Sequence, residues 1–115
     1  MKQRVITVPK DKYAEKSLDY DEANENQLID FHLTDTDFKL LWDNGLFTLI
    51  NDAGNSNIDD YEDDSVKGVI NIENVINALK VKQVSIAGEL VSSVEKIRNL
   101  FEEALERGTG VYFYF

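Results

Sequence analysis

Carboxylates crowd the middle of the chain, and their type and spacing could support three kinds of chemistry. The group falls within residues 52–64 and consists of Asp52, Asp59, Asp60, Glu62, Asp63 and Asp64, with Tyr61 among them. Such a group could hold a calcium ion, could supply an acid and a base for hydrolysis, or could accept hydrogen bonds from the cationic side chains of a partner.

A calcium-binding loop of the EF-hand type does not fit this spacing. If the loop began at Asp52, its third position would need Asp or Asn, its sixth Gly and its twelfth Glu. The chain offers Gly54, Asn57 and Asp63 at those positions. A looser calcium site stays open as an alternative.

Groups suited to catalysis are few. Neighbouring carboxylates such as Asp59 and Asp60 point apart in a strand or a helix, so adjacency alone builds no dyad. His32 is the only histidine, and the chain has no cysteine; a lone histidine on a strand is more often a surface residue than a general base. The glycines at 108 and 110 lack the lysine of a phosphate-binding loop. We therefore expect no enzyme activity, no cofactor and no metal.

Net charge is the most informative property of the composition. The chain carries 22 Asp and Glu against 12 Lys and Arg, a net charge of −10. Between Ser17 and Val66 there are fourteen acidic residues and one basic residue, Lys39, so the middle of the chain carries the imbalance. This segment would repel nucleic acid and anionic membranes and would attract a basic protein. The plain alternative is a solvated face that serves only solubility.

Recognition of a basic partner suits these residues best. A protein that binds nucleic acid presents lysine and arginine to phosphates, and carboxylates can receive the same charge-assisted hydrogen bonds. The expected contact residues are Asp52, Asp59, Asp60, Tyr61, Glu62, Asp63 and Asp64, in which the tyrosine would serve as an aromatic anchor. The acids of residues 19–25 are weaker candidates. The absence of cysteine and of a long apolar run predicts a protein of the reducing cytoplasm.

Hydrophobic periodicity predicts the elements that must position these side chains. Strands are expected at residues 4–8, at a sheet edge because Pro9 follows, at 27–33 and at 111–115. Helices are expected from the polar start at 34–37 to Gly45, over 71–79, and most clearly over 89–107. Residues 10–26 are a loop or a weak helix, 46–50 a helix or a strand, 51–57 a loop, and 58–66 an irregular or short extended segment.

These elements predict a single α+β domain over residues 1–115. A small, mostly antiparallel sheet would include the N- and C-terminal strands, because a strand of Val111-Tyr112-Phe113-Tyr114-Phe115 needs partners on a buried face. The long C-terminal helix and one or two shorter helices would pack against that sheet.

Several segments resemble small bacterial immunity proteins encoded beside polymorphic toxins, including those of contact-dependent growth inhibition systems. The resemblance covers residues 31–115 and lies in residues 37–47, in Ile50-Asn51-Asp52, in Ile58-Asp59-Asp60-Tyr61-Glu62 and in the closing residues 108–113. It implies a cytoplasmic protein that binds and neutralises one cognate toxin domain, often a nuclease. Two alternatives stay open: a nucleic-acid mimic of the anti-restriction or anti-CRISPR type, and a regulatory subunit whose acidity is incidental.

Overall fold

The chain forms a four-stranded sheet and five α-helices in a computed structural model that describes residues 3–60 and 62–115. In chain order the elements are β1 (Arg4–Pro9), α1 (Lys12–Asp19), the 3₁₀ turn η1 (Glu25–Gln27), β2 (Leu28–Leu33), α2 (Asp35–Asp43), α3 (Leu46–Gly54), β3 (Asp64–Val66), α4 (Val69–Ser85), α5 (Glu89–Arg107) and β4 (Val111–Tyr114). The predicted α+β class, with both terminal strands in the sheet, is confirmed.

The sheet has the strand order β2-β1-β4-β3, and all three pairings are antiparallel. Ile6 of β1 lies opposite Phe31 of β2 on one side and Phe113 of β4 on the other. Alternation along the strands therefore turns Ile6, Val8 and Phe113 to the same face, where all three side chains are fully buried.

The prediction that the first strand lies at a sheet edge is wrong, because β1 pairs on both sides. Pro9 is tolerated for a geometric reason. The amide of Lys10 donates to the Gln27 carbonyl at 2.9 Å, so by the antiparallel alternation the nitrogen of Pro9 points away from β2, toward the β4 side. Pairing with β4 ends at Thr7, opposite Tyr112, so no hydrogen bond is lost at the proline.

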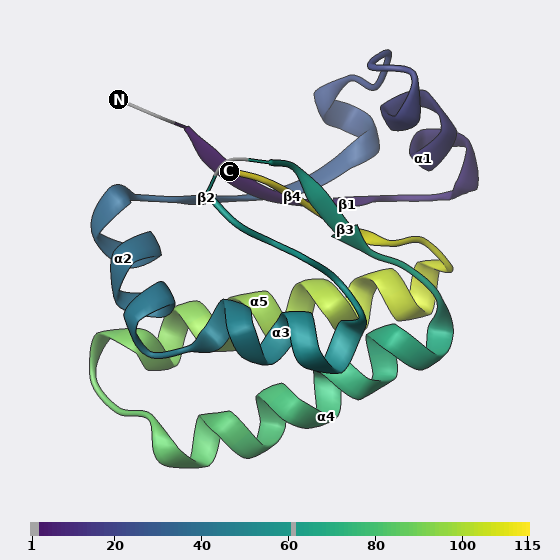
Figure 1. The fold of residues 1–115 in the computed structure, drawn as a ribbon. Coiled ribbons are helices and arrows are strands. Elements are labelled where there is room, and N and C mark those ends of the chain that lie inside the picture. The colour runs from purple at the N-terminus through teal and green to yellow at the C-terminus, as the bar shows by residue number, and fades with distance from the viewer. Residues whose placement is uncertain (1–2, 61) are drawn as a thin grey trace.

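The helices lie mostly on one side of the sheet (Figure 1). The long helix α5 runs directly beneath the strands, and α4 forms the outermost layer, in contact with both α3 and α5. Helix α1 sits on the opposite face of the sheet. Among the described residues, no helix has the length and apolar character that crossing a bilayer requires.

Helix α3 differs from the sequence-based expectation at its end. The segment 46–50 is helical, and the helix continues through Gly54 into residues that were expected to form a loop. Packing overrides the turn-forming residues here: a Cβ at Gly54 would lie 2.8 Å from a methyl of Val75 and 3.0 Å from one of Val66, so glycine lets α3 close onto α4 and β3. Asn55, with φ of 58°, then ends the helix. In residues 10–26, the helical alternative is the correct one for 12–19.

The burial of the core predicts that two isoleucines contribute very differently to the free energy of unfolding. Ile97 on α5 is fully buried, whereas Ile70 on α4 is 74% exposed. Ile97→Ala should lower the free energy of unfolding by about 2–5 kcal/mol, because a buried cavity remains. Ile70→Ala, measured in dilute solution, should change it by about 0.5 kcal/mol or less. Urea denaturation followed by circular dichroism measures both, and equal losses would contradict the assignment of α5 to the core.

Candidate functional site

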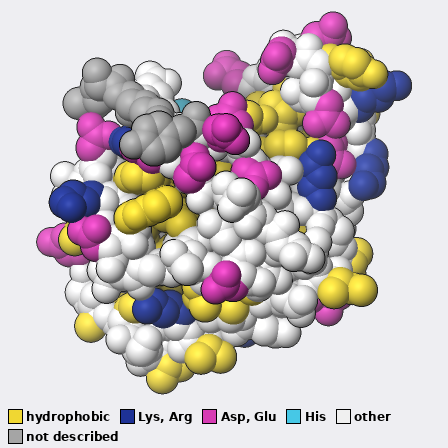
Figure 2. Space-filling model, viewed as in Figure 1, with side chains coloured by type: hydrophobic (Ala, Val, Ile, Leu, Met, Phe, Trp, Pro, Cys, Tyr) yellow, Lys and Arg dark blue, Asp and Glu magenta, His cyan; other side chains and the backbone are white. Residues whose placement is uncertain are grey.

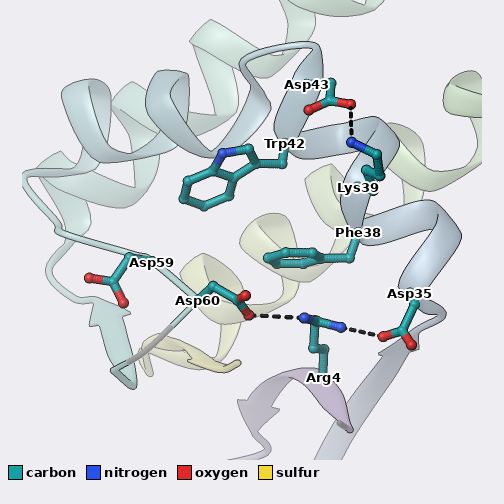
Figure 3. A pocket seen from close by; sticks show the side chains of 8 residues that line it. All are labelled: Arg4, Asp35, Phe38, Lys39, Trp42, Asp43, Asp59 and Asp60. Carbon is teal, nitrogen blue, oxygen red and sulfur yellow. Dashed lines mark hydrogen bonds and ion pairs between the residues drawn. The ribbon is translucent and has the colours of Figure 1, made fainter. Parts of the chain in front are cut away.

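A pocket of about 540 Å³ opens between α2, the start of β1 and the segment that leads to β3 (Figure 3). Among the described residues, eight line it: Arg4, Asp35, Phe38, Lys39, Trp42, Asp43, Asp59 and Asp60. Two are aromatic, four are acidic and two are basic, so the lining carries a net charge of −2. The pocket combines an apolar wall with an excess of carboxylate.

Helix α2 supplies the aromatic wall. Thr34 caps this helix by accepting a hydrogen bond from the Asp37 amide at 3.1 Å. The spacing of four residues then places Phe38 and Trp42 on one face, with ring centroids 5.8 Å apart. Phe38 is buried, whereas Trp42 is 41% exposed, and both rings point toward the space in front of Asp59 and Asp60. The indole is therefore presented to a ligand on a rigid element.

Buried aromatic residues hold this wall in place from behind. Phe115 packs edge-on against Phe38 at 5.0 Å and against Phe47 of α3 at 5.1 Å between centroids. Edge-to-face pairs of this kind add about 0.5–1.5 kcal/mol beyond the burial of their area. The apolar wall of the pocket is thus continuous with the core.

Arg4 crosses the floor of the pocket. Its side chain is only 11% exposed, and its guanidinium contacts the carboxylates of both Asp35 and Asp60. Nη2 lies 3.0 Å from Oδ1 of Asp60, and the guanidinium carbon lies 4.0 Å above the centroid of the Phe38 ring. The buried cation is therefore compensated by two charges and one ring face.

Asn51 shapes the loop that carries the opposite wall. Its amide nitrogen donates to the Ile58 carbonyl at 3.0 Å, and its Oδ1 accepts from the Ile58 amide at 2.7 Å and from Ser56 Oγ at 2.9 Å. These bonds tie residues 56–58 to the last turns of α3. Further along, Oδ1 of Asp59 accepts from the Glu62 amide at 2.8 Å.

The predicted contact residues occupy three environments. Asp59 and Asp60 both line the pocket, where the backbone is irregular, but their carboxylates point in different directions, and that of Asp60 points to Arg4 (Figure 3). Glu62 and Asp63 are exposed beyond it, while Asp64 begins β3 and accepts a hydrogen bond from the Asn57 amide at 2.5 Å, a structural role.

Two further predicted residues do not join the pocket. Asp52 is exposed on α3 and does not line it. Tyr61 lies outside the described residues. Figure 2 shows the carboxylates gathered in the upper part of the molecule, around the sheet and α1.

Sequence reasoning missed most of the pocket. Six lining residues were not among the expected contact residues: Arg4, Asp35, Phe38, Lys39, Trp42 and Asp43. One signal was available: two aromatic residues at positions 38 and 42, flanked by acids at 35 and 43, share a helix face. The contribution of Arg4 depends on contacts across 31 and 56 residues of sequence, which periodicity does not encode.

The remaining catalytic candidates are not gathered. His32 is exposed on β2 and lines an adjoining hollow of about 590 Å³, which shares Arg4 and Asp35 with the pocket. Within the described ranges, no group of three His, Asp or Glu side chains is arranged to hold a metal ion.

The outer face of the sheet carries a second acidic neighbourhood. Glu15 of α1 accepts from the Gly110 amide at 2.8 Å and from the Tyr112 hydroxyl at 3.1 Å. Burial, then the charges of Glu15 and Asp19, raise the pKa of Tyr112. Burial also raises the pKa of Tyr114 to about 12, followed by the charges of Asp63, Asp21, Asp19 and Asp30. Carboxylates distant in sequence therefore act together on this face.

Comparison with protein families, curated proteins and solved structures found no match to this chain. The assignment of function consequently depends on the site itself and on the segments that carry the sequence resemblance.

The raised pKa of Tyr114 predicts a loss of stability in alkaline solution. The ordinary pKa of tyrosine is 10.0, and that of folded Tyr114 is about 12, so the folded chain retains the proton between these values. The contribution of protonated Tyr114 to the free energy of unfolding is fully present below pH 10 and is lost as the pH rises to about 12. In Tyr114→Phe, the free energy of unfolding should fall by about 2 kcal/mol less over this pH range than in the natural sequence, as measured by urea denaturation. Identical pH profiles for the two proteins would contradict it.

Proposed function

We propose that this chain is a binding protein, not an enzyme, and that it neutralises a basic partner domain as an immunity protein neutralises its cognate toxin. One observation carries the proposal: the half-exposed indole of Trp42 stands beside carboxylates in a pocket large enough for a side chain. Cytoplasmic residence and a nuclease partner belong to the same proposal.

The pocket suits a cationic side chain from the partner. An aromatic face attracts an arginine or lysine by about 0.5–2 kcal/mol, and carboxylates at its edge supply charge-assisted hydrogen bonds. Arg4 already makes this arrangement within the chain, with its guanidinium over Phe38 and against Asp60. The half-exposed indole of Trp42 offers a second aromatic face in the same pocket, whose lining also includes the carboxylates of Asp43 and Asp59 (Figure 3).

The ion pair at the rim of the pocket can be broken with little loss of stability. Lys39 contacts Asp43 at 3.1 Å, and their side chains are 77% and 55% exposed. An exposed pair at this helical spacing contributes only about 0.3–0.5 kcal/mol. A partner cation that takes the place of Lys39 beside Asp43 would therefore meet little competition.

Long-range electrostatics would bring a basic partner to this side of the molecule. Residues 1–66 hold sixteen Asp and Glu and six Lys and Arg, a net charge of −10, whereas residues 67–115 hold six of each. Opposite charge on a partner accelerates association, which matters when an inhibitor must reach a toxin before the toxin acts.

The segments that resemble immunity proteins lie around this pocket. Residues 37–47 form most of α2 and the start of α3, and they include Phe38, Lys39, Trp42 and Asp43 of the lining. Residues 58–62 include Asp59 and Asp60 on the opposite wall. Two segments separated in sequence thus contribute to one concave site, which supports a shared binding role.

Affinity capture tests the proposal. The immobilised chain would be exposed to lysate of its source cells at low salt and again at about 1 M salt, where the Debye length is only about 3 Å. We expect one basic toxin domain to be retained in both conditions, and its toxicity to be abolished by the purified chain. Recovery of a host or phage nucleic-acid enzyme would favour the mimic instead. A bulk basic fraction that washes off with salt would reject both.

The pocket predicts which substitutions weaken binding of the captured partner. Trp42→Ala should lower the affinity by about 10–100-fold, as expected for an aromatic anchor, and Asp59→Asn should mainly slow association. Glu95→Gln removes the same charge from an exposed site on α5 and serves as the matched control. Surface plasmon resonance measures the rates, and a thermal melt verifies that each variant is folded. Unchanged affinity for folded Trp42→Ala would move the site elsewhere.

A further inference from the structure

Helix α4 exposes hydrophobic side chains on its outer surface. Ile70 is 74% exposed, Val81 73% and Val84 88%, although each is a residue type that folded proteins usually bury. The helix forms the outermost layer of the fold, and hydrophobic side chains appear along that border of the molecule (Figures 1 and 2). The buried side of the same helix is occupied by Ile72, Val75, Ile76 and Leu79. α4 therefore has one apolar face inside the fold and a second one outside.

The outer residues follow the spacing of a helix–helix seam. Ile70, Asn74, Asn77, Val81 and Val84 succeed one another at steps of four, three, four and three, and all five are exposed. That repeat is the one by which two helices pack along their length, and asparagine in such a seam fixes register at some cost in stability. The steps place all five side chains within one stripe, called here the α4 seam.

Charge favours a second copy of this chain as the occupant of the seam. Residues 67–115 carry six acidic and six basic residues, whereas the remainder of the chain carries the whole net charge of −10. Two copies that meet through α4 approach with their neutral parts and keep their acidic parts apart. Contact through the acidic parts would instead be repulsive.

The flank of the seam is complementary to itself. Glu73 and Lys80, both exposed, lie on the same side of the stripe, one turn either side of Asn77. In an antiparallel pair related by a two-fold axis, Glu73 faces the partner's Lys80, and the reverse contact repeats it. The same register sets Ile70 against the partner's Val81 at both ends and brings the asparagines together at the centre.

We propose that two copies of this chain associate through antiparallel packing of their α4 helices. One seam of this length buries less than the approximately 1,200–2,000 Å² of a standard interface, so the dimer is weak and depends on concentration. The pocket lined by Trp42 lies away from α4, so each copy keeps its partner site open. A dimer would present two such sites to a partner. The proposal does not depend on the function proposed above.

Sedimentation equilibrium of the full chain, up to about 1 mM, tests the association. We expect the mass to rise from one chain to two for the natural sequence and to remain at one for Val81→Asp. Thr48→Asp is the matched control, since threonine is isosteric with valine and Thr48 is exposed on α3. A single-chain mass at every concentration overturns the proposal. The proposal is also overturned if the Val81→Asp variant is folded and still forms the dimer. It is overturned as well if the chain stays monomeric and binds neutral phosphatidylcholine vesicles, because the α4 seam would then contact lipid.

A charge exchange tests the antiparallel register. Glu73→Lys places like charges opposite one another and should weaken the dimer several-fold, while the double variant Glu73→Lys with Lys80→Glu should restore it. Because the chain has no cysteine, single variants Asn74→Cys and Asn77→Cys can be mixed and oxidised, and position 74 of one copy faces position 77 of the other in this register. A charge-exchanged double variant as weak as the single one, together with no 74–77 cross-link in the mixture, overturns the register.

Discussion

The buried guanidinium of Arg4 is the interaction on which the site depends. A cation removed from water costs several kcal/mol unless charges and hydrogen bonds replace its hydration. Here that compensation comes from Asp35 at the start of α2, from Asp60 in the segment before β3, and from the face of Phe38. One side chain of β1 thereby fixes the distance between two otherwise separate walls. The carboxylate of Asp60 contributes to architecture, while the half-exposed indole of Trp42 remains on the open side of the pocket.

The structure divides the chemistry of the chain between two parts. The first 66 residues carry the net negative charge and every residue of the pocket lining. The later residues supply the electrically neutral helical layer and the strand β4, which sits in the middle of the sheet. The two parts are joined through the core, where Phe113 and Phe115 meet residues of α2, α3 and α5. A scaffold and a binding surface can thus be altered separately.

Local signals in the sequence were sufficient for most elements and insufficient for the site. The periodicity of α5, the cap at Thr34 and the glycine after α2 are short-range features, and the structure has them as expected. Pro9 led to the wrong prediction of an edge position for β1. A proline inside the sheet is tolerated here because the pairing with β4 ends before it, which the sequence does not reveal. Asn51 and Gly54 suggested a loop, yet α3 continues through both, and Gly54 packs closely against Val66 and Val75. The sequence identified the acids of residues 59–60. It did not identify the aromatic wall and Arg4, because these form a pocket with the acids only through contacts between residues distant in sequence.

The position of β4 imposes an order on folding. β1 can pair early with β2, which follows it closely in sequence, but its other neighbour lies more than a hundred residues further along the chain. At a synthesis rate of roughly 5–20 residues per second, β4 emerges about 5–20 s after β1, and until then this edge of β1 has no partner strand. During this interval Ile6 and Val8 lack their cover, and a strand with an open apolar edge invites pairing with other chains. Non-local closure of this kind also slows refolding relative to helical proteins of the same size. The sheet that supports the pocket is therefore the last part of the molecule to become complete.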